Sequence, residues 1–151
     1  MNQIPISTSV VSGVILSELE DGYRLLLMKR TKDEFWCHVA GKLEEHELAW
    51  EAFVREVREE TGLEVSELYS AEFLEQFYEP KQNCIHIIPA FVGLVSPGVE
   101  VILNQEHTEY AWCSLEEADN LAPYANQKAL YHHVWTYFVK TRPHPRMRIA
   151  C

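Results

Sequence analysis

Short apolar runs separated by turn signals dominate the chain and predict a mostly β framework. Several runs are rich in β-branched or aliphatic residues, and Glu-Asp-Gly and Glu-Pro-Lys-Gln-Asn turns interrupt them. The predicted strands are residues 7–16, 23–30, 34–39, 69–78, 85–95, 99–103 and 109–113. The first two runs predict one hairpin, and the long fourth and fifth runs predict another.

Helical signals occur in three places. Residues 47–61 have a strong helical pattern that stops at Gly62, a residue typical of helix ends. Ser114 followed by Glu117 resembles a capping box that opens a short helix. Residues 124–140 predict a closing helix.

The chain is predicted to form one α+β domain over residues 1–151, since 151 residues is the size of one domain and no linker or repeat divides them. Residues 141–151 contain two prolines, and we expect either an ordered arm or a loose tail there.

Charge narrows the functions that are open. Asp and Glu number 23 against 13 Lys and Arg, a formal net charge of −10. An acidic protein repels polyanions at long range, so nucleic acid polymers and anionic membranes are poor partners. We expect a small-molecule substrate, and a monomer or a homodimer.

The cysteines and the N-terminus favour a cytoplasmic protein. The four cysteines are scattered, without a Cys-x-x-Cys pair or a histidine at finger spacing, so neither a zinc site nor a redox dithiol is indicated. The first 16 residues lack a basic region and a signal-peptide cleavage site. We therefore expect reduced thiols.

The predicted helix over residues 47–61 carries carboxylates in phase with its apolar face. Ala49, Ala52 and Phe53 form the inward stripe, and steps of three and four residues continue it to three glutamates. These are Glu56, Glu59 and Glu60. Unpaired, they would repel one another near an apolar core, whereas Mg²⁺ or Mn²⁺ would neutralise them with oxygen ligands. The alternative is a solvated helix face paired with Arg55 and Arg58.

The spacing over residues 41–63 decides between these interpretations. Gly41, Glu47, the Arg55-Glu56 pair, the Glu59-Glu60 pair and Gly62 stand at fixed intervals. This segment resembles the complete consensus box of the Nudix hydrolases, with Ala40 standing where many members have a second glycine. The box covers about a sixth of the chain, and the order of strands outside it is also similar.

The resemblance implies an α/β/α sandwich with a mixed β-sheet and an Mg²⁺- or Mn²⁺-dependent hydrolysis of a phosphoric anhydride. It implies that Glu56, Glu59 and Glu60 bind metal, with Glu47 supporting the site directly or through water. Arg55 would orient the glutamates. Metal ions offset the charge of a diphosphate and lower the pKa of the attacking water.

A further carboxylate is implied by a second local similarity. Glu106-His107, four residues and Trp112 resemble a region of bacterial Nudix enzymes that act on nucleoside triphosphates and dihydroneopterin triphosphate. Glu106 would then be a metal ligand or the base, with Glu109 as an alternate. The base itself stays open between the box helix and this loop.

Two residues before the box are candidates for substrate binding. In relatives, the basic residue at the position of Arg30 can meet substrate phosphate, although a surface arginine at a strand end is equally compatible. Trp36 could stack on a base or pterin ring, or could belong to the core.

The leading hypothesis is therefore a pyrophosphohydrolase of a nucleoside or pterin triphosphate, which releases monophosphate and pyrophosphate. An ADP-ribose, nucleotide-sugar or dinucleotide hydrolase is the alternative within the enzymes. A non-catalytic nucleotide-sensing module is the alternative from another class, although such modules usually lose box glutamates.

Overall fold

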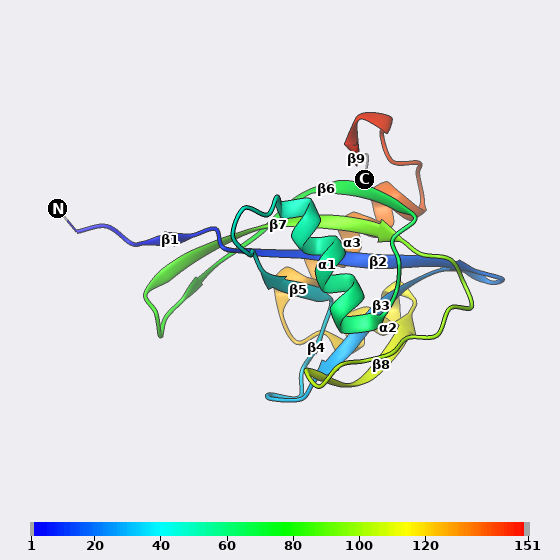
Figure 1. Cartoon of the computed structure of the whole chain (residues 1–151), viewed down its shortest axis with the longest axis horizontal. Coiled ribbons are helices and arrows are strands. Elements are labelled where there is room, and N and C mark those ends of the chain that lie inside the picture. The colour runs from blue at the N-terminus through cyan, green and yellow to red at the C-terminus, as the bar shows by residue number, and fades with distance from the viewer. Residues whose placement is uncertain (1, 150–151) are drawn as a thin grey trace.

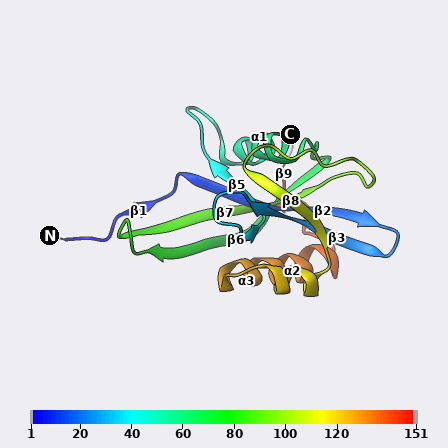
Figure 2. The same ribbon diagram turned by 90° about the horizontal axis from the view of Figure 1, so that it is seen from below.

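A central β-sheet with helices on both faces forms the molecule, as the computed structural model shows for residues 2–149 (Figure 1). The helices are α1 (Ala49–Thr61), α2 (Leu115–Leu121), α3 (Ala125–Val134), the π-helical turn η1 (Trp135–Val139) and the 3₁₀ turn η2 (Pro145–Met147). In Figure 2, α1 covers one face of the sheet, and α2 and α3 cover the other. The predicted α/β/α sandwich is confirmed.

The sheet is mixed, also as predicted. Its strands are β1 (Ile6–Ser7), β2 (Val10–Leu19), β3 (Gly22–Arg30), β4 (Trp36–Cys37), β5 (Val39–Lys42), β6 (Glu67–Glu79), β7 (Cys84–Leu94), β8 (His107–Cys113) and β9 (Arg148–Ile149). Within residues 2–149 these nine strands form one sheet whose main path is β4-β3-β2-β7-β6-β9. The β2–β7 and β1–β7 pairs are parallel, and the other pairs are antiparallel.

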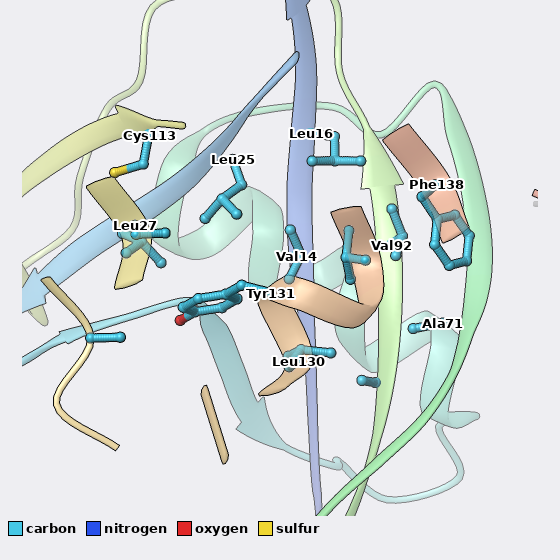
Figure 3. Packing of buried hydrophobic residues seen from close by; sticks show 14 of the residues in the cluster. Val14, Leu16, Leu25, Leu27, Ala71, Val92, Cys113, Leu130, Tyr131 and Phe138 are labelled. Carbon is cyan, nitrogen blue, oxygen red and sulfur yellow. The ribbon is translucent and has the colours of Figure 1, made fainter. Parts of the chain in front are cut away.

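Each face of the sheet packs against its own apolar cluster. On β3, Leu25 and Leu27 belong to the cluster under α3, whereas Leu26 and Met28 belong to the cluster under α1. Figure 3 shows the first cluster, in which Tyr131 from α3 lies among strand residues. Because both faces of β3 are buried, its sequence is a continuous apolar run instead of an alternating one.

Helix α1 starts two residues later than the pattern predicted and ends where expected. The Glu51 carboxylate accepts a hydrogen bond of 2.9 Å from the backbone N–H of Leu48, which precedes the first turn. At the other end Gly62 has φ 72°, a left-handed conformation that glycine adopts without a steric cost. The Gly62 N–H donates to the Arg58 carbonyl at 2.9 Å, which closes the helix.

The strand predicted over residues 99–103 is wrong. This segment is irregular and passes over the end of α1, where the Ile102 N–H donates to the Thr61 carbonyl at 2.8 Å. Val101 is buried in the cluster under α1. The apolar residues that suggested a strand therefore fill the core without a strand partner.

Other predicted boundaries differ in detail. The strand expected over residues 34–39 is divided into β4 and β5, and the closing helix continues beyond α3 as η1. The arm after residue 140 ends in η2 and β9, which pairs with β6. Over residues 141–149 the chain therefore forms an ordered arm, while residues 150–151 lie outside the described part.

Three of the four cysteines lie in the part of the chain that the structure describes. Cys37, Cys84 and Cys113 are free, and Cys151 lies outside residues 2–149. Within the same residues, no helix is long and apolar enough to cross a membrane.

Candidate active site

A cleft of about 830 Å³ lies between the end of β3, the β4–β5 segment, the outer face of α1 and the loop that precedes β8. Acidic and basic side chains both line it. The acidic residues are Glu44, Glu56, Glu59, Glu60 and Glu106, and the basic residues are Arg30, Lys32, Lys42 and Arg55. The structure thus brings three glutamates of the box, Glu56, Glu59 and Glu60, to one cavity with the predicted loop glutamate, Glu106.

On one side of the cleft, β5 and α1 are in close contact. Gly41 on β5 lies against the carboxyl group of Glu56, and a Cβ atom at Gly41 would overlap that carboxyl group. A side chain at Gly41 would therefore displace Glu56. The backbone of Gly41 is not left-handed. Its glycine is therefore required by the close contact with Glu56 and not by the backbone conformation.

Arg55 holds the carboxylates of the box. Its Nε and Nη2 donate to the two oxygens of Glu47 at 2.8 and 3.0 Å, a bidentate pair. Its Nη1 donates to Glu56 at 2.8 Å and to Glu59 at 3.2 Å. Its Nη2 also donates to the Lys42 carbonyl at 2.9 Å, which connects the helix to β5.

Glu47 supports the site through Arg55. One of its oxygens also accepts a hydrogen bond of 3.0 Å from the Glu44 N–H, so both oxygens have partners. The hydrogen bonds from Arg55, followed by that from Glu44, lower the pKa of Glu47. Glu47 does not line the cleft.

Glu60 is the most deeply buried of these carboxyl groups, with 2% of its surface exposed. Its Oε2 has no hydrogen-bond partner within residues 2–149. Burial raises the pKa of Glu60 to about 9, and a hydrogen bond with Glu56 and the charge of Glu106 add to the shift. A buried carboxylate with a free oxygen is costly unless something neutralises it.

Glu106, in the loop before β8, and His107, the first residue of β8, face Glu60. One ligand atom from each of the three residues lies within 4.8 Å of the other two. The distance from His107 Nε2 to Glu60 Oε1 is 3.8 Å. Burial lowers the pKa of His107, which favours its neutral, ligating form at neutral pH. Two carboxylates are the oxygen donors that Mg²⁺ or Mn²⁺ prefers, and an imidazole nitrogen is typical of transition-metal ions, so this donor set fits a divalent ion.

The loop of Glu106 is fixed to the loop that follows β3. The Thr31 N–H donates to the Glu106 carbonyl at 2.9 Å, and the Thr31 hydroxyl donates to the Gln105 carbonyl at 2.8 Å. The Asn104 side chain accepts from the Glu106 N–H at 3.0 Å. These bonds hold the loop that follows β3 against the loop that carries Glu106.

The two predicted substrate-binding residues lie in different places. Arg30 lines the cleft, pairs with Asp33 at 3.1 Å and lies 4.9 Å from the centre of the Phe35 ring. Trp36 does not line the cleft and packs against the apolar cluster under α3. Its backbone carbonyl accepts a hydrogen bond of 3.0 Å from Gln127. The position of Trp36 therefore corresponds to the core alternative.

Sequence reasoning missed a buried polar network in the wall of the cleft. His38, which lines the cleft, contacts Glu75 through Nε2 at 3.0 Å and the Tyr131 hydroxyl through Nδ1 at 2.8 Å. The Ser12 hydroxyl also donates to Glu75. Burial alone would raise the pKa of Glu75, but the charge and hydrogen bond of His38 lower it overall. These residues are dispersed along the sequence, so no local spacing revealed them.

Together the sandwich fold and the carboxylate-lined cleft are those of an enzyme that acts on phosphoric anhydrides. The sequence family called NUDIX domain matches residues 8–134, and the chain belongs to this family. It is therefore a Nudix hydrolase.

Relatives with named activities support this assignment. The chain is 36% identical over 107 residues to a bis(5′-nucleosyl)-tetraphosphatase (asymmetrical) from Mus musculus. The aligned region covers 70% of this chain and 73% of the relative. The chain is also 28% identical over 115 residues to the nucleoside triphosphatase NudI of Klebsiella pneumoniae, and that alignment covers 70% of this chain and 82% of NudI. A C. elegans Ap4A hydrolase binary complex has the same fold, with a TM-score of 0.75 at 22% identity over 86% of this chain and 96% of that one.

Proposed function

We propose that the protein hydrolyses a phosphoric anhydride of a nucleoside polyphosphate in a reaction that depends on Mg²⁺ or Mn²⁺. The observation that carries this proposal is the buried Glu60 carboxyl group, whose free oxygen lies beside Glu106 and His107 in the cleft. Glu56, Glu59, Glu60 and Glu106 would hold the ions. When bound, such ions offset phosphate charge and acidify a coordinated water.

The chain's own residues would divide the remaining work. Arg55 would hold Glu56 and Glu59 in position, and Glu47 would in turn orient Arg55, as their hydrogen bonds suggest. Glu59 is half exposed at the mouth of the cleft, where it could accept a proton from water, as could Glu56 or Glu106. Arg30 and Lys32 would bind phosphate on the opposite wall.

The proposed reaction is a substitution by water at phosphorus and involves no oxidation or reduction. A water oxygen bonds to one phosphorus atom while the bridging oxygen on the other side of that atom leaves with the bonding electron pair. The water proton passes to a carboxylate. A dinucleoside tetraphosphate would give a nucleoside triphosphate and a monophosphate, and a nucleoside triphosphate would give a monophosphate and pyrophosphate.

A dinucleoside tetraphosphate is the first substrate class we propose. The support is the 36% identity to the tetraphosphatase from mouse and the four basic residues that line an open cleft of about 830 Å³. The second candidate is a nucleoside triphosphate, supported by the more distant similarity to NudI. This order reverses the preference that the sequence alone favoured.

A substrate panel with product analysis tests the proposal. The panel is a dinucleoside tetraphosphate, nucleoside triphosphates, dihydroneopterin triphosphate and ADP-ribose, each with Mg²⁺, with Mn²⁺ and with chelator. We expect turnover of the tetraphosphate above that of every other compound, and none with chelator. Preferred turnover of a triphosphate would move the assignment to the second candidate. Tight nucleotide binding without turnover of any compound would instead support the nucleotide-sensing alternative.

A matched pair of variants connects the activity to the cleft. Glu60→Gln should abolish turnover of the preferred substrate. Glu64→Gln should leave it unchanged, because Glu64 is exposed, pairs with Arg58 at 2.9 Å and does not line the cleft. Equal activity of the two variants would contradict the site.

A further inference from the structure

A second cavity, of about 470 Å³, lies away from the proposed active site. It shares no lining residue with the cleft. Its walls include Leu16 and Val92 on the sheet, Phe138 on η1, and Arg142 and Arg148 on the arm. The cleft is lined by residues of α1, whereas Leu16, Val92 and Phe138 of the second cavity belong to the apolar cluster under α3, on the other face of the sheet. In Figure 1 the arm, in red, is likewise far from β4 and β8.

Aromatic and aliphatic side chains form the floor of this second cavity. Tyr69 on β6 and Phe138 on η1 meet edge to face, with their ring centres 5.9 Å apart, and Tyr23 on β3 completes the aromatic wall. Figure 3 shows Leu16 and Phe138 on either side of β7. Flat apolar walls of this kind suit a planar ring.

The π-helical turn lies directly beside this wall. The Lys140 N–H donates to the Trp135 carbonyl at 2.9 Å, five residues back, so η1 is wider than a normal α-helical turn. Such turns are rare and frequently occur at functional sites. Here the turn places Phe138 in the cavity.

Two guanidinium groups meet at the same cavity. Arg148 on β9 is paired across the sheet with Tyr69, and Arg142 comes from the start of the arm. Within residues 2–149 neither guanidinium lies within 4.0 Å of a carboxylate. The segment that supplies them is basic in a protein of net charge −10, because residues 120–149 contain five Lys and Arg and no Asp or Glu.

One acidic residue adds a second kind of recognition. Glu67 lines the cavity and accepts a hydrogen bond of 3.1 Å from the Tyr69 hydroxyl. A carboxylate has several lone pairs, so Glu67 can also accept from an N–H group of a ligand. The cavity therefore offers flat walls for a ring, an acceptor for a ring N–H, and a two-arginine site for an anion.

We infer that this cavity binds a nucleoside monophosphate, with the phosphate between Arg142 and Arg148 and the base against Tyr69 and Phe138. The volume falls within the range of small-molecule sites. A monophosphate leaves little charge unpaired there, whereas a polyphosphate would bring excess negative charge close to Glu67. This inference is independent of the proposed hydrolysis, because no residue of the cleft takes part.

The test is binding of AMP to the full chain, measured by titration calorimetry in chelator so that the cleft holds no divalent ion. We expect AMP to bind, and adenosine and inorganic phosphate each to bind at least about tenfold more weakly. Arg142→Ala and Arg148→Ala should each weaken AMP binding at least about tenfold, the loss expected for one charge-assisted contact. Arg142 is exposed and unpaired within the described residues, so its variant should fold normally.

Arg146→Ala is the matched control, since Arg146 lies on the same arm but does not line the cavity. We expect it to change AMP affinity less than twofold, and all three variants to keep wild-type turnover. Three results would overturn the inference: no AMP binding in chelator, an equal loss in Arg146→Ala, or a loss in Arg30→Ala instead, which would place AMP in the cleft. None of these results bears on whether the enzyme hydrolyses its substrate.

Discussion

Glu60 and Glu75 are both buried carboxyl groups, one on the α1 side of the sheet and one on the α3 side, and their surroundings differ. Glu75 accepts hydrogen bonds from Ser12 and His38, and the net effect lowers its pKa despite burial. Glu60 has an oxygen without a partner within residues 2–149, and its pKa is raised to about 9. The oxygens of Glu75 are thus satisfied by the protein itself, whereas Glu60, with a free oxygen beside other carboxylates, is a candidate for binding a cation.

The largest effect should come from Glu60→Gln. Loss of this carboxylate should reduce kcat at least about 100-fold, as removal of a positioned catalytic group does. The variant should stay folded, because an amide avoids the cost of a buried charge. Melting curves with and without Mg²⁺ check the cause: the ion should raise the Tm of the wild type and not that of the variant. A variant with wild-type turnover would remove Glu60 from the site.

Glu75→Ala should affect stability more than chemistry. It leaves the Ser12 hydroxyl and His38 Nε2 without their hydrogen-bond partner in a buried site, a change that costs about 3 kcal/mol and lowers Tm by roughly 10 °C. Denaturant titration measures the loss, and kcat per folded molecule should stay within a few-fold of wild type. A double variant with leucine at both His38 and Glu75 should regain part of the stability. Loss of turnover without loss of stability would give Glu75 a catalytic role.

Arg55→Lys tests whether the carboxylates around Glu60 depend on the directed hydrogen bonds of the Arg55 guanidinium. Lysine keeps the charge but cannot bind Glu47 in bidentate fashion while also reaching Glu56. We expect kcat to fall about tenfold, in line with the loss of a residue that orients metal ligands, with a smaller change in KM. Arg58→Lys is the control, because Arg58 is exposed and pairs only with Glu64 among residues 2–149. Similar losses in both variants would indicate a general effect on α1.

The two glutamates should also give stability a pH dependence of opposite sign. In chelator, native Glu60 keeps its proton up to about pH 9, whereas an unfolded glutamate releases it near 4.5. Stability should therefore fall as pH rises between these values, and Glu60→Gln should flatten the fall. Glu75 has a lowered native pKa, so its contribution is present above 4.5 and is lost as pH falls through that native pKa. Measurement of Tm against pH for Glu60→Gln and Glu75→Ala reports the alkaline and the acid parts of this dependence.

The sequence predicted the parts of the site that follow a local rule. The spacing from Gly41 to Gly62 lies on one loop and one helix, so helical geometry alone places Glu56, Glu59 and Glu60 on one face. Glu106 required the second local similarity, because it reaches the cleft from a distant loop. The parallel pairing of β2 with β7 follows from the topology of the family and not from any single strand.

Long-range contacts explain what the sequence did not reveal. His38 and Tyr131 are 93 residues apart, and Glu75 enters from a third element, so their hydrogen bonds exist only after the sheet has formed. Residues 99–103 have the composition of a strand but are irregular, and their contacts are with the end of α1 and the cluster beneath it. Trp36 illustrates the same limit, because its neighbours on α3 are distant in sequence.

The hydrogen bonds from Thr31 to the Glu106 loop have a consequence for how this enzyme could acquire new substrates. Through Thr31 they connect Arg30, the residue proposed to bind phosphate, to the loop of the carboxylate Glu106. A change of length in either loop would move both groups, so specificity and catalysis would vary together. Exchange of one loop with that of a relative should therefore inactivate the enzyme, whereas exchange of both loops together should transfer the relative's preference.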